Sequence, residues 1–304
     1  MNKLQQLQIS KVNYSAMSPL TYGYLAMLMV LLIWSGFSLT VRNIGASPLA
    51  IADVALIRFS VPLVLLSPWF IKHLAVIKNV RISDFLFILL GGIPFLFLAS
   101  LGAKIVPTAY VATILTGTPP FFVAVLSMLF YKQAITKQRL FMLSLILIGV
   151  LIMVAGLADQ LSVEIFTGIG FLLCASLLWS TYTLGLKRAG LSALTVAIIV
   201  SYFSFFIMLF LVLSGTVASN WGSFSLQQAM PFLLVQGVGV GIVATIGFSY
   251  AVSQLGSAKS SIIGALSPGI TTLLAVPIFD EPLSIAILCG ISLTITGVIL
   301  SNRV

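Results

Sequence analysis

Arg58 is the residue whose type and position say most about the chemistry of this chain. It lies inside the apolar run Ala50–Ile71, where a charge costs at least about 2.5–3.5 kcal/mol on membrane-insertion scales. Its guanidinium could bind a carboxylate or phosphate group of a solute through paired hydrogen bonds. It could instead be structural and bind backbone carbonyls or Asp53, although neighbours on one helix face are three or four positions apart, not five. Both interpretations stay open.

Two Trp-Ser pairs lie well inside apolar runs, Trp34-Ser35 and Trp179-Ser180. A buried indole needs an acceptor for its N–H. The tryptophans could form the aromatic walls of a central cavity, to which Tyr182 would add a hydroxyl. They could equally be packing residues, with the serines permitting close helix contact.

Pro119-Pro120 and Pro268-Gly269 interrupt apolar runs at corresponding positions of the two halves. Proline removes a backbone hydrogen bond and clashes with the preceding turn. Interrupted helices at matching positions point to the binding site of a transporter. Thr116 and Ser267 could then bond to the freed carbonyls or face the solute. Alternatively, these prolines only shape helix packing.

Gln236 and Tyr250 are further polar side chains in an apolar run. Gln236 must form a hydrogen bond, either between helices or to a solute. The candidate substrate-binding residues are therefore Trp34, Ser35, Arg58, Thr116, Pro119, Trp179, Tyr182, Gln236, Tyr250, Ser267 and Pro268.

Groups that membrane-embedded catalysis would need are missing from the sequence. The apolar runs contain no histidine and no carboxylate pair, and the chain has no phosphate-binding glycine-lysine loop. We therefore predict no catalytic residue, no metal and no cofactor, and a protein that is not an enzyme. A membrane scaffold or sensory protein, and an integral-membrane enzyme, remain as alternatives.

The composition predicts an all-α integral membrane protein. Of 304 residues, 60% are hydrophobic and only 7% are charged, whereas soluble domains carry roughly 25% charged residues. A helix needs about 20 apolar residues to cross a bilayer. Ten such runs are present, at Thr21–Val41, Ala50–Ile71, Ser83–Gly102, Thr108–Tyr131, Arg139–Gly156, Phe166–Leu186, Ala193–Ser214, Ala229–Tyr250, Lys259–Pro277 and Leu283–Ser301.

The net charge of +9 reflects membrane topology rather than nucleic-acid binding, because basic residues concentrate in cytoplasmic loops. With both termini cytoplasmic, only Arg42 and Lys104 fall outside. Twelve basic residues fall inside: Lys3, Lys11, Lys72, Lys78, Arg81, Lys132, Lys137, Arg139, Lys187, Arg188, Lys259 and Arg303. We expect a multi-pass protein of the plasma (inner) membrane.

The chain contains one unit twice. Ten of the thirty positions from Gly23 to Ala52 are identical to those 145 residues later. Each copy holds five predicted spans, and five is odd, so the second copy must enter the membrane from the opposite side. The predicted organisation is a cytoplasmic tail (1–20), a first five-helix repeat (21–156), a connector (157–165) and an inverted second repeat (166–304).

Several short runs resemble one membrane-protein family. They are Leu32-Ile33-Trp34-Ser35-Gly36-Phe37, Ser47-Pro48-Leu49, Ile57-Arg58-Phe59, Gly256-Ser257-Ala258, Leu266-Ser267-Pro268 and Phe279-Asp280-Glu281-Pro282-Leu283-Ser284. With the five-plus-five layout, the chain from Thr21 to Ser301 resembles the EamA-type transporters of the drug/metabolite transporter superfamily. Members often carry an acidic residue after both the fourth and the ninth span. Here Glu281 aligns with Lys132, which departs from that pattern.

The resemblance implies a secondary transporter, often an exporter, of small metabolites or drugs. Alternating access would move the solute through a central cavity. The expected partners are a small-molecule substrate and the lipid bilayer, without nucleic acid. The sequence leaves the substrate, the driving force and the oligomeric state open.

Overall fold

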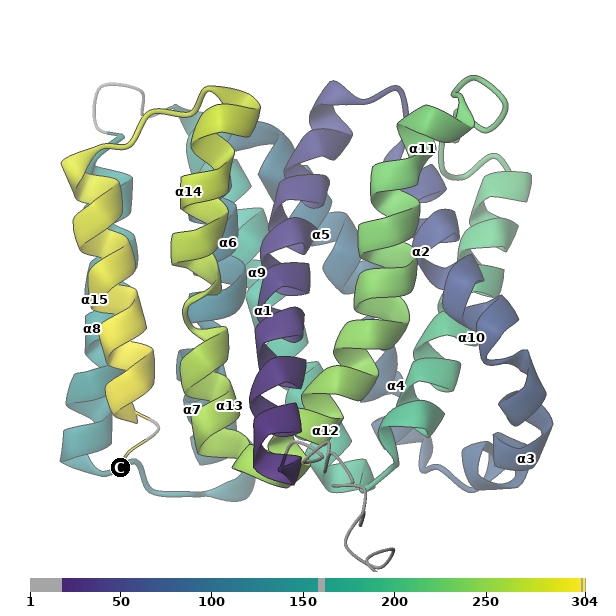
Figure 1. Ribbon diagram of the computed structural model, residues 1–304, viewed down its shortest axis with the longest axis horizontal. Coiled ribbons are helices and arrows are strands. Elements are labelled where there is room, and N and C mark those ends of the chain that lie inside the picture. The colour runs from purple at the N-terminus through teal and green to yellow at the C-terminus, as the bar shows by residue number, and fades with distance from the viewer. Residues whose placement is uncertain (1–17, 158–161, 302, 304) are drawn as a thin grey trace, which may run out of the picture.

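A computed structural model describes residues 18–157, 162–301 and 303, and its helices run side by side between two faces (Figure 1). The lower face is the one where the first helix begins and the chain ends, and the opposite face is the upper one. Most of the predicted N-terminal tail, 1–20, lies outside the described residues, as do 158–161 of the predicted connector.

The first half contains eight α-helices, a 3₁₀ turn and a π-helical turn. They are α1 (Pro19–Asn43), η1 (Ile44–Ala46), α2 (Ile51–Leu65), α3 (Ser67–Lys78), α4 (Ile82–Leu89), α5 (Ile93–Ile105), α6 (Thr108–Ala112), η2 (Thr113–Gly117), α7 (Pro119–Tyr131) and α8 (Lys137–Ala155).

The second half begins at Val163, three residues before the predicted start at 166. Its elements are α9 (Val163–Ala189), α10 (Ala193–Leu213), α11 (Leu226–Phe232), the π-helical η4 (Leu233–Ala244), α12 (Thr245–Leu255), α13 (Ser257–Gly264), α14 (Ser267–Phe279) and α15 (Ile285–Ser301).

The described residues contain eight helical stretches that are long and apolar enough to cross a membrane. The bent pair α2–α3 would make a ninth, and α15 is a shorter apolar helix of 17 residues. Large apolar side chains such as Leu32, Leu151 and Phe210 are exposed on the outside of the helices, as contact with lipid requires. The predicted all-helical, multi-pass membrane class is confirmed, and the count of ten spans stays a prediction.

The predicted span Ala50–Ile71 is wrong as a continuous helix, because α2 ends at Leu65 and α3 turns away by 91°. Pro68 has no N–H to bond to the Val64 carbonyl, and its ring clashes with that carbonyl in a straight helix. The hydroxyl of Ser67 donates to the same carbonyl at 2.7 Å. Helix α3 therefore lies at the lower edge of the molecule (Figure 1).

The predicted interruptions at the two proline motifs are confirmed. The π-helical turn η2 precedes Pro119, and a break after Gly264 precedes Pro268. Helices α7 and α14 each have 13 residues and end on a left-handed residue, Lys132 (φ 52°) and Asp280 (φ 53°). These positions differ by 148 residues, 280 minus 132, so Asp280 is the counterpart of Lys132. The predicted alignment of Glu281 with Lys132 is therefore off by one position.

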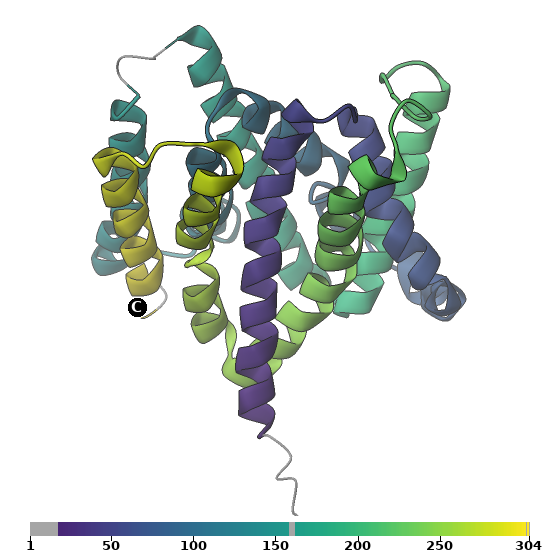
Figure 2. The ribbon, with the colours of Figure 1, turned by 45° about the horizontal axis from the view of Figure 1, so that its top comes forward.

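Helices α8 and α15 pack against each other at one end of the molecule (Figures 1 and 2). Glycines make the contact close: a Cβ on Gly149 would lie 2.5 Å from the Gly290 carbonyl oxygen, and a Cβ on Gly297 would lie 2.8 Å from Ile146. Small residues give this kind of backbone approach inside membranes. The pair forms a layer at the far end of the molecule from α3 and α10.

Candidate functional site

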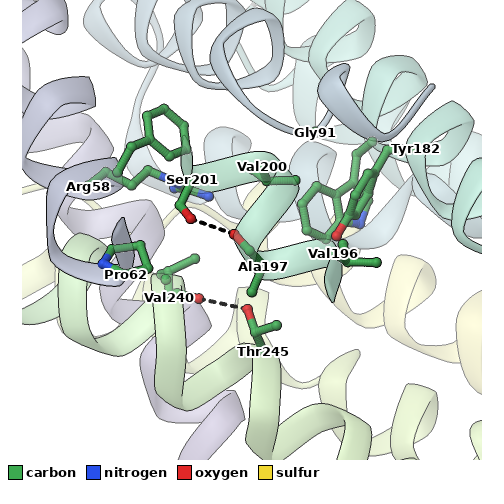
Figure 3. Close-up of a pocket in the computed structure, with 13 residues that line it drawn as sticks. Arg58, Pro62, Gly91, Tyr182, Val196, Ala197, Val200, Ser201, Val240 and Thr245 are labelled. Atoms are coloured by element: carbon green, nitrogen blue, oxygen red, sulfur yellow. Dashed lines mark hydrogen bonds between the residues drawn. The ribbon is translucent and has the colours of Figure 1, made fainter. Parts of the chain in front are cut away.

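A cavity of about 70 Å³ lies between the two halves of the chain (Figure 3). The first half contributes Arg58, Phe59 and Pro62 from α2 and Gly91 from the turn after α4. The second half contributes residues of α9 and α10 and the stretch from η4 to α12, which includes Val240. The cavity is smaller than the roughly 300–1,000 Å³ of pockets that enclose drug-sized ligands.

Arg58 is only 6% exposed and its Nη1 donates a hydrogen bond of 2.7 Å to Oε1 of Gln236. Gln236 is fully buried, and its Nε2 donates to the hydroxyl of Thr40 at 2.9 Å. The guanidinium carbon lies 5.2 Å from the ring centre of Phe37 and 5.7 Å from that of Phe59. The structure therefore joins Arg58 and Gln236, two sequence candidates 178 positions apart, in one network.

Close backbone approach makes this network possible. A Cβ on Gly237 would lie 2.6 Å from Cγ2 of Val61, so only glycine lets η4 approach α2 this closely. Gln236 lies within the π-helical stretch Leu233–Ala244. A π-helix changes the register of side chains relative to an α-helix and is frequent at functional sites. Together these features bring the Gln236 amide to Arg58.

A direct Asp53–Arg58 pair, one of the sequence alternatives, is wrong. The Asp53 carboxylate accepts hydrogen bonds from the backbone N–H groups of Ala50 at 2.8 Å and Asn220 at 3.0 Å, and from the hydroxyl of Ser219. It thereby caps the first turn of α2, where a negative charge is stabilising. Asp53 ties this helix to the segment after α10 at the upper face.

Trp179 and Tyr182 form an aromatic wall of the cavity. Their ring centres are 5.0 Å apart, and Phe95 lies 5.1 Å from Trp179. A Cβ on Gly91 would lie 2.7 Å from the Tyr182 ring, so that ring rests directly on the backbone. The Tyr182 hydroxyl and the Trp179 indole N–H make no hydrogen bond to any described residue, which leaves two donors in the cavity wall.

Trp34, Ser35, Ser267 and Pro268 do not line this cavity. The hydroxyls of Ser35 and Ser267 are 3.3 Å apart at the contact between α1 and α14, where Pro268 is also buried. Trp34 packs 5.3 Å from the ring of Phe248 instead. Trp34 and Trp179 therefore have different surroundings. A role in solute binding stays a prediction for Trp34, Ser35, Ser267 and Pro268.

Thr116, Pro119 and Tyr250 also lie away from this cavity. The hydroxyl of Thr116 donates to the Ala112 carbonyl at 2.8 Å, and the Pro119 carbonyl accepts from Ser180 at 3.3 Å. Both groups are hydrogen-bonded to other parts of the protein near the interruption before α7. Tyr250 is 39% exposed, and the solute role predicted for all three stays a prediction.

Ser201, Thr245 and Thr40 belong to the site but were not sequence candidates. The Ser201 hydroxyl donates to the Ala197 carbonyl at 2.6 Å and the Thr245 hydroxyl to the Val240 carbonyl at 3.1 Å (Figure 3). The oxygen lone pairs of the Ser201 and Thr245 hydroxyls can still accept hydrogen bonds, but their hydrogens are donated to nearby backbone carbonyls. Isolated hydroxyls in apolar runs are common, so no sequence signal distinguished these three.

An ion pair joins the two halves at the upper face. Arg42 Nε donates to Glu281 at 3.2 Å, while Nη1 donates to the Ala103 carbonyl at 3.1 Å. Glu281 also accepts from the Thr108 N–H at 2.7 Å and from its hydroxyl at 2.9 Å. The Glu281 carboxylate, which lies in the segment after α14, therefore caps the start of α6 and pairs with Arg42 at the end of α1.

A second ion pair joins the halves at the lower face. Arg188, in the last turn of α9, donates to Asp84 in the first turn of α4 and also to the Ser83 hydroxyl at 3.0 Å. The guanidinium carbon lies 4.7 Å from the ring centre of Phe87. Among the described residues, these are the two salt bridges, and each links one half to the other.

The sequence profile of the EamA-like transporter family matches residues 21–155 and again residues 166–303. The chain belongs to the EamA-like transporter family. The match confirms the resemblance read from the sequence motifs, and membership makes the chain a membrane transport protein. The two matched segments fall one in each half, so the cavity of this EamA-like protein lies between two copies of the family unit.

Twenty-seven chains of solved structures match this EamA-like protein in fold. One, titled "Crystal structure of protein", shares 14% sequence identity with a TM-score of 0.61, over 92% of this chain and 96% of that one. The likeness shows a shared fold over nearly the whole of both chains. No curated protein matches the chain in sequence.

We expect Gln236→Leu to destabilise the protein by about 1–3 kcal/mol, because it leaves Arg58 and Thr40 without their buried partner. Thermal unfolding in detergent measures this loss. Gln133→Leu is the matched control, because Gln133 is exposed after α7. Equal unfolding temperatures for the two variants would show that the Arg58–Gln236–Thr40 network does not stabilise the fold.

Proposed function

We propose that the protein is a secondary transporter that exports small solutes through the cavity between its halves. The observation that carries the proposal is that both halves line a cavity containing a buried cation, Arg58. An intramembrane charge at such a place is the signature of a substrate pathway. The outward direction and the class of small metabolites or drugs follow from likeness to the family alone.

Two inverted five-helix repeats, ten spans in all, are the arrangement that supports this function best. The α7 and α14 interruptions, with equal lengths and matching left-handed ends, are what two copies of one unit would give. In Figure 1, α1 ascends from the lower face and its sequence counterpart α9 descends from the upper one. Such repeats place the substrate site between the copies near the midplane.

We place both termini on the cytoplasmic side of the plasma (inner) membrane. The lower face carries the described members of the predicted inner set, on α3, before α4, around the α7–α8 and α9–α10 turns, on α13 and after α15. Arg42 and Lys104 instead lie at the upper ends of α1 and α5 (Figure 1). Cytoplasmic segments are the ones enriched in Lys and Arg. The lower face is therefore assigned to the cytoplasm.

The two inter-half ion pairs fit alternating access. Arg42–Glu281 links the halves at the upper face, and Arg188–Asp84 links them at the lower face. A cavity that opens to one side at a time requires the contacts on that side to separate while those on the other persist. Both pairs are formed in this structure, and in the proposed cycle opening of either side would separate the pair at that face.

Solute flux is the direct test. Proteoliposomes loaded with a chemically diverse mixture of small metabolites should release at least one component faster than protein-free liposomes, as mass spectrometry of the external medium would show. Heat-denatured protein in the same lipid is the control for leakage. If no component leaves faster than in the controls, the transporter proposal fails.

Orientation is tested by thiol labelling in a background with Cys174→Ser and Cys289→Ser, since both native cysteines are exposed. A membrane-impermeant maleimide added to intact cells should label Lys104→Cys. It should label Lys137→Cys and Lys187→Cys only after permeabilisation. The reverse pattern would invert the assignment of the two faces.

Cross-linking tests alternating access once a transported solute is known. In the same cysteine-free background, a short bifunctional thiol reagent should stop flux when it bridges Arg42→Cys to Glu281→Cys, and likewise when it bridges Asp84→Cys to Arg188→Cys. Each single-cysteine variant, treated identically, should keep its flux. Flux that persists in a fully cross-linked pair would exclude separation of that face as a step in transport.

A further inference from the structure

The charge of Arg58 is not neutralised by any described side chain. Its one hydrogen bond goes to the neutral amide of Gln236, and its ring contacts are with Phe37 and Phe59. Among the described residues, no acidic one lines the cavity. A buried, unpaired cation costs several kcal/mol even after the protein relaxes around it. The fold therefore holds a charge whose partner is not supplied by the described protein.

The other described acidic residues are committed elsewhere. Asp53 caps α2, Asp84 pairs with Arg188, and Glu281 pairs with Arg42. Glu164 and Asp280 are exposed at the upper ends of α9 and α14. None of these five carboxylates can reach the cavity without unfolding a helix end or breaking an ion pair between the halves. Among the described residues no carboxylate supplies a counter-charge for Arg58, and a bound anion could supply it.

The donors around the cavity favour a planar oxyanion. A guanidinium has five N–H donors, and Arg58 uses one nitrogen, Nη1, for Gln236. Its remaining N–H groups, the Tyr182 hydroxyl and the Trp179 indole N–H have no acceptor among the described residues. A carboxylate accepts two parallel hydrogen bonds from the fork of an arginine. A neutral amide group has only one acceptor oxygen and no charge, so it would match these donors less well than a carboxylate.

The number of charges separates a carboxylate from a phosphate ester. A phosphate monoester carries about −1.5 to −2 at pH 7, and Arg58 is the one cation among the described residues that line the cavity. A phosphate monoester would leave about half to one negative charge buried against Trp179, Val196, Val200 and Val240. A monoanion leaves none. The apolar and aromatic lining in turn suits a hydrocarbon or aromatic body attached to the anionic group.

We infer that the cavity binds a small organic monocarboxylate, with its carboxylate on Arg58 and its apolar body against the Trp179–Tyr182 wall. This inference rests on the proposed transport function and names the class of its solute. Gln236 and Thr40 act as positioning residues, because they hold the guanidinium without touching the solute. The bound carboxylate and the Arg58 guanidinium together carry no net charge. Binding of the solute therefore offsets the free-energy cost of the buried guanidinium.

The test compares carboxylates with their neutral amides by thermal unfolding of the purified protein in detergent, since a ligand that binds the folded state raises its apparent stability. The probes are acetate and acetamide, benzoate and benzamide, and phenylacetate and phenylacetamide. At least one carboxylate should raise the Tm while its amide does not. Arg58→Gln should weaken that binding at least about tenfold, because it removes a charge-assisted pair.

Two further variants make the outcome specific. Arg139→Gln removes a positive charge at the exposed start of α8, and it should keep the full carboxylate shift. Arg58→Lys keeps the charge but loses the fork, so it should bind the carboxylate less tightly than wild type.

The inference is overturned if carboxylate and amide give equal shifts, if no carboxylate in the set shifts the wild type, or if Arg58→Gln retains the wild-type affinity. If Arg58→Gln fails to fold, Arg58→Lys decides by its carboxylate affinity. Flux of neutral solutes that Arg58→Gln leaves unchanged would refute this inference and leave the transport function standing. Absence of any flux would refute the transport function itself.

Discussion

A single constraint organises the centre of this protein: a charged side chain inside a membrane needs polar partners or a counter-charge. Arg58 receives an amide from Gln236 and the faces of two phenylalanine rings. That contact requires the close approach of α2 and η4 at Gly237 and the π-helical register of η4. The same approach draws the two halves together around the cavity, so the position of Arg58 and the location of the site have one cause.

A second constraint is that backbone groups must stay hydrogen-bonded where lipid excludes water. The interruptions caused by Pro68, Pro119 and Pro268 would each free carbonyls. Hydroxyls beside these breaks are bonded: Ser67 donates to the Val64 carbonyl and Thr118 to that of Ile114, both at 2.7 Å. The Ser67 hydroxyl thus replaces the N–H that Pro68 lacks, and the Thr118 hydroxyl adds a second bond to the Ile114 carbonyl, which already accepts the Thr118 N–H.

The two copies of the family unit are alike in sequence pattern and unlike in chemistry. Trp179 and Tyr182 line the cavity, whereas their counterparts 145 positions earlier, Trp34 and Phe37, pack against Phe248 and under the Arg58 guanidinium respectively. Arg58 itself has Phe203 as its counterpart. The ion pairs between the halves also differ, since Glu281 both pairs with Arg42 and caps a helix start at the upper face, whereas Asp84 pairs with Arg188 at the lower face. A doubled fold thus supplies the scaffold, and substitutions that break the symmetry make one site.

The sequence by itself determined the membrane class, the doubled unit, the family and the unusual character of Arg58 and Gln236, because hydropathy, repetition and the cost of buried polar groups are local properties of the chain. It also located the interruptions at Pro119 and Pro268, since proline acts on its own turn, but it missed the bend at Pro68. It did not determine that Arg58 bonds to Gln236 rather than Asp53, that Trp179 and not Trp34 lines the cavity, or that Ser35 and Ser267 contact each other between helices. Those outcomes depend on how closely and in what register helices from the two halves approach, and only tertiary packing at positions such as Gly237 and Gly91 sets that distance.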